Sequence, residues 1–371
     1  MTCQQSPTTY SFVNNPIAFL FEVSTNTLRT ISIVVGGTTF FLSAIPYQVN
    51  TGIYRFSFDI SDIIKPFCSN MTMIDYSVNI SQDSYTFTGK ALMGGISKEM
   101  NLYLLQNNTN IFDFRLLNSI NNFLFTTRTN RDIIPMRRNE LGDVYFLRPT
   151  ADEFSISTNT GIVHSLGTAD IATPCALDLQ ALISSFSNAD QVSEIYFCIA
   201  GVPRFKIVIF DSFSEQSYVL RFRNSMGVFE KLEITGKATR TPTFGDSTTF
   251  NQWDDSIKDF RQSRLRVPVS DKIIAEAGYK STDDLYFIGD LLSSDEIYLM
   301  DRIHERKCLV SSDSYSHMLR QTIPESITLN IDFVDQDINI SPISGIEDTT
   351  FIWATEGGDL MIDENNEFIT V

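Results

Sequence analysis

The chain has 371 residues and a mass of 42.0 kDa, which is more than one hydrophobic core usually serves, so two or three domains are expected. Its formal net charge of −17 leaves no wide cationic surface for a phosphate backbone, and this excludes nucleic acid as a partner. The 29 Phe and 13 Tyr residues, beside only 2 Trp, favour half-buried strands over helices.

The first block alternates short apolar runs with turn residues. Runs rich in Ile, Val and Phe predict strands at 17–23, 31–35, 38–42, 53–58, 73–80, 84–88, 101–105, 110–116, 122–127 and 143–147. Over 60–67 the apolar spacing changes to i, i+3, i+4 and i+7, which predicts a short helix capped by Asp59 or Ser61. The stretch 128–138 is predicted to be a loop, and residues 1–149 a β-sandwich domain.

The second block contains an internal echo of the first. Residues 58–67 return as 177–186, both with the pattern apolar-Asp-apolar-x-x-apolar-Ile-x-x-Phe. A smaller echo, Thr-Gly-Lys-Ala, begins at Thr88 and at Thr235. We interpret these echoes as a duplication, with residues 150–245 as a second, related β-sandwich domain. The alternative is chance recurrence of an Asp-capped turn in a chain rich in Ser and Ile.

The clearest hairpin in the sequence falls at the end of the second block. Strands are predicted at 194–198, 205–210, 218–222 and 229–235. The turn between the last two is Asn224-Ser-Met-Gly227, and Gly227 stands where a positive φ is needed.

The third block, 246–345, is predicted to be a C-terminal α+β or β-rich domain. A polar linker at 239–251 leads into it, and Leu285, Ile288 and Leu291 form one helical face after a Ser-Thr-Asp-Asp start. Strands follow at 296–300, 306–310 and 326–334. The tail 346–371 is acidic, contains no Lys or Arg, and is predicted to be a terminal hairpin or docking arm.

The usual reactive groups are missing or misplaced. The five cysteines are scattered without a Cys-x-x-Cys pair, and the three histidines lack zinc-site spacing. The run Asp335 to Asn339 begins like a calcium loop, but Ile340 stands where the loop needs Gly. Asp254 and Asp255 lie beside Trp253, yet neighbours on a strand face opposite ways, so we interpret them as a loop with an anchoring Trp. We therefore expect no catalytic, cofactor-binding or metal site, no cofactor, and no enzymatic activity.

Arginine clusters are the main positive patches of this acidic chain. An Arg patch of one subunit meeting the acidic tail of its neighbour is one interpretation, and scattered solvated charge is the other. The candidate subunit contacts are Arg128, Arg131, Arg137, Arg138, Arg261, Arg264, Arg266, Asp359, Asp363 and Glu364.

Three segments resemble virion structural proteins, of the tail or baseplate, from phages and prophages of Bacteroidetes. They are the hairpin 218–236, the segment 284–299 with the strand 307–310 after it, and the acidic ending 356–371. None is a catalytic signature. The resemblance implies a tail or baseplate component built from β-sandwich modules, arranged as a homo-oligomeric ring with other virion proteins as partners.

The sequence thus predicts a mainly β chain, with tandem antiparallel β-sandwich domains and a small C-terminal α+β unit. The expected function is that of a non-enzymatic virion protein, made in the cytoplasm of the bacterial host and assembling through β-domain contacts. Neither a signal peptide nor a membrane span is visible, so no membrane insertion is expected. The alternative is a carbohydrate-binding β-sandwich module of a bacterial surface or host-recognition protein.

Overall fold

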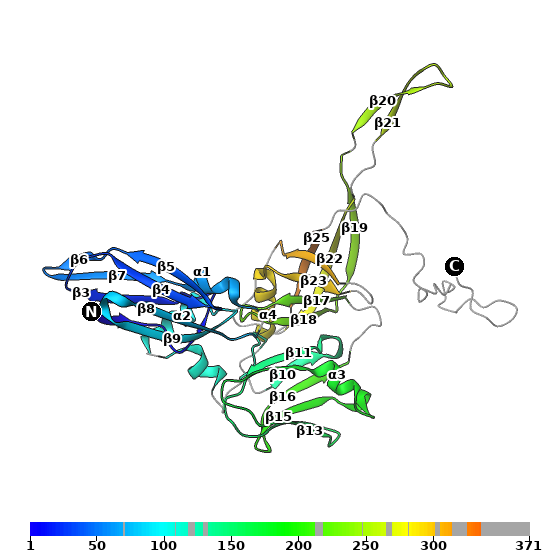
Figure 1. The fold of residues 1–371 in the computed structure, drawn as a ribbon. Coiled ribbons are helices and arrows are strands. Elements are labelled where there is room, and N and C mark those ends of the chain that lie inside the picture. The colour runs from blue at the N-terminus through cyan, green and yellow to red at the C-terminus, as the bar shows by residue number, and fades with distance from the viewer. Residues whose placement is uncertain are drawn as a thin grey trace. The chain divides into compact units, whose positions relative to one another are not determined.

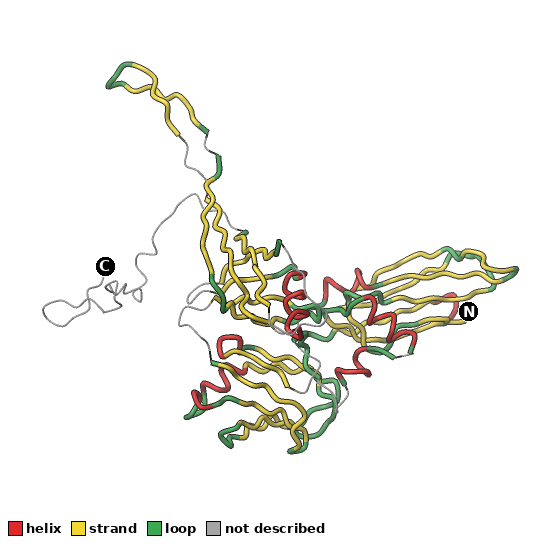
Figure 2. Tube along the Cα trace, turned by 180° about the vertical axis from the view of Figure 1, so that it is seen from behind, coloured by secondary structure: helices red, strands yellow, loops and turns green. Residues whose placement is uncertain are grey.

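The computed structural model describes residues 1–334 except 70, 108, 118–122, 129–132, 212–217, 247, 265–268, 281, 301–304 and 314–324. The chain divides into two compact units, Met1–Thr241 with Lys272–Val334, and Pro242–Asp271 with Asp335–Val371. Strands predominate in the described residues, with short helices between them (Figures 1 and 2). The mainly β fold class expected from the sequence is confirmed.

Residues 1–92, the first module, form two facing sheets. One has the order β1 (Thr2–Gln5), β3 (Ala18–Val23), β7 (Ile53–Asp59), β6 (Tyr47–Asn50). The other has the order β2 (Tyr10–Phe12), β9 (Tyr85–Leu92), β8 (Ile74–Ile80), β4 (Arg29–Val35), β5 (Thr38–Ala44). Alternate residues of β3 and β4, such as Phe19, Phe21, Ile31 and Ile33, are buried in one shared core. Because both sheets contribute inner faces to it, the module is a β-sandwich.

The second module, residues 133–210, has a five-stranded sheet and a strand pair. The sheet order is β10 (Ile133–Arg137), β16 (Val202–Phe210), β15 (Glu194–Ile199), β12 (Phe154–Thr158), β13 (Val163–Gly167). The pair is β11 (Asp143–Leu147) with β14 (Pro174–Asp178). Helix α3 (Leu179–Ser184) follows β14, and its Ile183 joins Phe146, Phe154 and Phe197 in one core.

Both modules repeat one chain order: a strand, a hairpin, the antiparallel partner of the first strand, a helix and a second hairpin. These elements are β3, β4–β5, β7, α1 (Ser61–Ile64) and β8–β9 in the first module. They are β11, β12–β13, β14, α3 and β15–β16 in the second. The sheet orders β2-β9-β8-β4-β5 and β10-β16-β15-β12-β13 also correspond, and in each the first two strands are parallel. The two modules therefore share one topology.

The echoed segments 58–67 and 177–186 lie at equivalent places, where the second strand of the pair turns into the helix. The Asp59 carboxylate accepts hydrogen bonds from the backbone N–H groups of Ser61 (2.9 Å) and Ile17 (3.0 Å). Asp178 caps α3 by accepting from Ala181 N (3.0 Å). The helix predicted over 60–67 is present as α1 followed by a 3-10 turn, η1 (Lys65–Phe67). A carboxylate that satisfies free N–H groups at a helix start explains why Asp recurs there.

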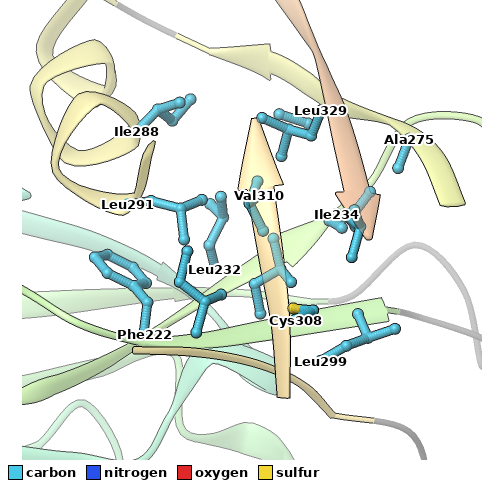
Figure 3. Close-up of a cluster of buried hydrophobic side chains, with 14 of the residues drawn as sticks. Phe222, Leu232, Ile234, Ala275, Ile288, Leu291, Leu299, Cys308, Val310 and Leu329 are labelled. Carbon is cyan, nitrogen blue, oxygen red and sulfur yellow. The ribbon is translucent and has the colours of Figure 1, made fainter. Parts of the chain in front are cut away.

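A third module contains one seven-stranded sheet. Its order is β18 (Phe229–Ile234), β17 (Tyr218–Arg223), β23 (Ile297–Met300), β24 (Glu305–Ser311), β25 (Glu325–Phe333), β22 (Val269–Lys280), β19 (Ala238–Phe244). Helix α4 (Thr282–Ser293) packs Ile288 and Leu291 against Phe222 and Leu232 (Figure 3). The predicted helix and its three following strands are confirmed.

The third module again has a hairpin, a strand, a helix and a hairpin in chain order, as β17–β18, β22, α4 and β23–β24. Strand β17 pairs antiparallel with β23, as β4 does with β8 and β12 with β15. Next to β24, however, lies the later, antiparallel β25 instead of an earlier parallel strand. The smaller echo is not equivalent: the Thr88 copy lies within β9, whereas the Thr235 copy falls between β18 and β19.

The pairing moves both domain boundaries away from those predicted. Strands β10 and β11, placed by sequence in the first domain, pair with β16 and β14 of the second module. The hairpin 218–234, assigned to the second domain, pairs with β23 of the third. Local patterns identify strands, but hydrogen-bond partners distant in sequence decide which sheet each strand joins.

Several predicted strands are not strands. Residues 98–106 form helix α2 (Lys98–Gln106), whose first turn is capped by Ser97 (Met100 N to Oγ, 3.2 Å). Residues 112–116 form a short π-helix, η3 (Phe112–Leu116). Over 123–127 only an isolated bridge, Leu124 to Phe146, is present, and part of the predicted loop 128–138 is strand β10. Short apolar runs do not distinguish helix from strand, so capping and tertiary contacts decided these segments.

Glycines allow the loop after β9 to approach the β17–β18 turn. Gly94 and Gly227 have φ of +123° and +84°, and a side chain on either would collide with the backbone of the opposite loop, at Met226 and Met93. Gly95 N donates to Ser225 O over 2.6 Å. The positive φ predicted for Gly227 is confirmed.

Candidate assembly surfaces

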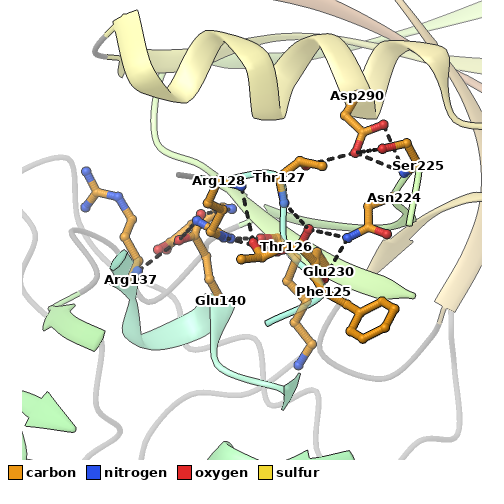
Figure 4. Close-up of polar contacts among 12 residues, drawn as sticks. Phe125, Thr126, Thr127, Arg128, Arg137, Glu140, Asn224, Ser225, Glu230 and Asp290 are labelled. Atoms are coloured by element: carbon orange, nitrogen blue, oxygen red, sulfur yellow. Dashed lines mark hydrogen bonds and ion pairs between the residues drawn. The ribbon is translucent and has the colours of Figure 1, made fainter. Parts of the chain in front are cut away.

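The first unit contains a buried network of charged and polar side chains that contact one another (Figure 4). Arg128, which is 6% exposed, lies 3.1 Å from Glu140 and 3.8 Å from Glu230, and its guanidinium covers the Phe287 ring at 4.1 Å. Glu230 also accepts from Thr126 Oγ1 (2.5 Å). The arrangement holds one cation between two carboxylates.

The same network joins segments of the second and third modules. Glu140 accepts from the N–H of Glu233 in β18 (2.8 Å) and from that of Arg137 (2.9 Å). Asp290 of α4 accepts from Ser225 N (3.0 Å) and Thr127 Oγ1 (2.8 Å). Burial raises the pKa of Glu230 and of Asp290, although hydrogen bonds to each carboxylate oppose the shift. The cavity beside the network has a volume of about 50 Å³, enough for a few water molecules. We interpret the network as a structural clasp.

The sequence raised other candidate catalytic and metal-binding residues, and local contacts account for the acidic pair among them. Asp254 accepts from Ser256 and pairs with Arg261 (3.2 Å), and Asp255 accepts from the Trp253 ring N–H (2.8 Å). His164 is exposed on β13, whereas His304, His317 and the run Asp335 to Asn339 lie outside the described residues. Within the described ranges no group of three or more His, Cys, Asp or Glu side chains is placed to hold a metal ion.

The second unit presents a hairpin, β20 (Thr249–Asp254) and β21 (Asp259–Arg264), where the sequence predicted a linker and a loop. It forms a two-stranded sheet of its own. Cross-strand pairing places Trp253 opposite Phe260, with ring centroids 5.2 Å apart, and Asn251 opposite Gln262 on the same face. Trp253 is 48% and Phe260 61% exposed, so Trp253 is not an anchor in a core. Two strands alone are marginally stable in water.

The first module exposes a second apolar surface along β5 and β6, the end strands of its two sheets. Phe41, Ile45 and Tyr47 are 70%, 74% and 57% exposed. No Asp, Glu, Lys or Arg occurs between residues 30 and 54, although charged residues make up 20% of the chain. We call this surface the uncharged edge. Free edges usually carry charges that block pairing with other chains, and this one does not.

The predicted contact residues fall into different environments. Arg128 is buried, which corrects the expectation that it faces another subunit. Arg138 binds within the second module, to Asp211 (3.2 Å) and to the carbonyls of 189, 190 and 192. Arg137 donates its backbone N–H to Glu140, while Arg261 and Arg264 are exposed on β21. The remaining candidates, Arg131, Arg266, Asp359, Asp363 and Glu364, lie outside the described residues.

The apolar residues of the hairpin and of the uncharged edge were not among the contact residues predicted from the sequence. The missing charge over 30–54 was the available signal for the edge, and it is visible in the sequence. The exposure of the aromatic residues was not visible in the sequence, because an alternating strand pattern does not show which face lacks a covering layer.

No protein-family model matches the chain, and a search of curated proteins gave no match either. Among the described helices, none combines the length and the apolar character that a membrane span requires.

Proposed function

We propose that the protein is a non-enzymatic structural component of a larger particle, a phage tail or baseplate protein, which assembles through contacts between β-modules. The single observation that carries the proposal is the β20–β21 hairpin, which exposes Trp253 and Phe260 and, among the residues that the structure describes, forms a sheet of two strands only. Such a ribbon gains stability when a partner covers its aromatic face.

The three-module topology supports the same function. Repeated β-modules joined by buried contacts suit a structural role, and in chain order the hairpin is an insertion between β19 and β22 of the third module. The clasp around Arg128 uses buried ion pairs within one chain and leaves the exposed aromatic surfaces for partners.

The test is deletion of the hairpin. Residues 248–264 are replaced by a short Gly-Ser turn, and the mass of the purified protein is measured by light scattering over a range of concentrations. We expect the melting temperature of the remaining chain to be preserved and the oligomer mass to fall. A second deletion removes the acidic tail, residues 346–371. We expect this deletion to weaken assembly, because the tail of one copy would no longer contact the exposed Arg261 and Arg264 of another. If neither deletion changes the oligomer mass, the proposal is wrong.

A carbohydrate-binding module is the second candidate, and one observation favours it. The hairpin face that carries Trp253 and Phe260 also carries the amides of Asn251 and Gln262. Aromatic rings beside amide groups suit the apolar face and the hydroxyls of a sugar. A glycan array with the intact protein and with Trp253→Ser separates the two functions, because only glycan binding predicts a signal that the substitution removes.

A further inference from the structure

The uncharged edge differs from the equivalent edge of the third module. There the outer strand of the first hairpin is β18, which carries Glu230, Lys231 and Glu233. That strand is covered: Glu140 of η4 (Arg138–Glu140) accepts from Glu233 N over 2.8 Å. In the first module the equivalent strand is β5, which carries no charge and exposes Phe41. One edge is closed by a contact within the chain, whereas no described strand pairs with the outer edge of β5.

The outer strand of the second module, β13, is the closest comparison. It is also free of Asp, Glu, Lys and Arg, but it is shorter than β5, and its one strongly exposed large apolar residue is Val163. The edge of β5 is longer, and β6, the end strand of the other sheet, also exposes Tyr47 and Val49. If a strand is added to this chain, the edge of β5 offers the greater apolar contact.

A strand that fits this edge has to be uncharged as well. A charged side chain placed against Phe41 or Ile45 would lose water without gaining a partner, and this opposes association. The chain itself supplies a suitable strand, because Thr249–Trp253 of β20 carries no charge and, within the described ranges, pairs with β21 on one edge only. In contrast, β21 carries Asp259, Arg261 and Arg264.

Electrostatics also favours these two surfaces for a contact between copies. Each copy has a net charge of −17, so two copies repel one another wherever acidic surfaces meet. Contact through surfaces without charge brings the least additional repulsion. This inference rests on the proposed assembly function: we propose that β20 of one copy adds as a strand to the edge of β5 in a second copy.

The donor hairpin and the acceptor edge are different surfaces, so the contact is heterologous. Each copy donates its hairpin to one neighbour and accepts a hairpin from another, which produces a ring if the rotation closes and a filament if it does not.

The experiment uses full-length variants that disable one surface at a time. The acceptor variant is Phe41→Lys with Ser43→Lys, both on exposed positions of β5. The donor variant is Phe250→Lys, which leaves the ring pair of Trp253 and Phe260 intact. Every added Lys makes the chain less acidic, so loss of assembly cannot arise from increased repulsion. Circular dichroism checks that the variants remain folded.

Sedimentation velocity should show that wild-type protein assembles and that each variant alone is monomeric. An equal mixture of the two variants should give a complex of twice the monomer mass, because the intact hairpin of one fits the intact edge of the other. The matched control, Val163→Lys with Ser165→Lys on β13, should assemble as wild type does.

Three outcomes overturn this inference while leaving the proposed function standing: acceptor variants that assemble normally, a mixture that stays monomeric, or assembly lost in the β13 control and not in the β5 variant. A wild-type protein that is monomeric at every concentration overturns both proposals.

Discussion

Replacing Arg128 by Ala is expected to lower the free energy of unfolding by about 3–5 kcal/mol. The guanidinium lies between the carboxylates of Glu140 and Glu230, whose side chains are 3% and 9% exposed. Without Arg128 both carboxylates remain buried and lose their cation. The free-energy cost of that uncompensated charge is larger than the contribution of the hydrogen bond that Arg128 also donates to the carbonyl of Lys231.

A second variant, Arg128→Lys, separates charge from geometry. Lysine keeps the positive charge but cannot reproduce the planar fork or the stacking over Phe287. We expect a smaller loss, of about 1.5–3 kcal/mol, the value of hydrogen bonds to charged groups.

Both losses can be measured by urea denaturation followed by circular dichroism. Hydrogen exchange adds a local measurement, because the N–H groups of Arg137 and Glu233 both donate to Glu140 and should exchange faster in Arg128→Ala. A loss below about 1 kcal/mol for Arg128→Ala would be the value of an exposed ion pair. That result would refute the clasp as a buried charge network.

Three further predictions concern pH, backbone conformation and thiols. Because burial raises the Glu230 pKa above its ordinary value of 4.5, the folded state still holds a proton at pH values where the unfolded chain has lost it. The stability of the wild-type protein relative to Glu230→Gln should therefore fall as the pH rises above 4.5. Parallel stability curves for the two proteins in pH-dependent denaturation would contradict this. Gly94→Ala should cost about 1–3 kcal/mol, seen as a lower melting temperature, and an unchanged melting temperature would exclude a strained turn there. At pH 8 a thiol reagent should label the exposed Cys3 well before Cys68 and Cys308, because burial raises the pKa values of those two thiols to about 11 and about 12. Equal labelling rates measured by mass spectrometry would be inconsistent with the fold.

Much of the secondary structure follows from local sequence. Alternation of apolar residues in β3 and β4, the Asp-capped helices after residues 59 and 178, and the Asn224–Gly227 turn all depend on contacts within a few residues. The echo between 58–67 and 177–186 marks equivalent strand-to-helix junctions for the same reason, because a cap and a helical face are local features.

Sheet membership, and with it the surfaces that we propose for assembly, was decided by tertiary structure. Nothing in the local sequence distinguishes Arg128 and Arg138 from the exposed Arg261. In the structure, however, Arg128 pairs with Glu140 and Arg138 with Asp211. Trp253 was expected to anchor a loop, whereas in the structure it lies on strand β20 and is 48% exposed. Local sequence sets how a segment is hydrogen-bonded to its neighbours along the chain, whereas burial depends on which distant segment covers it.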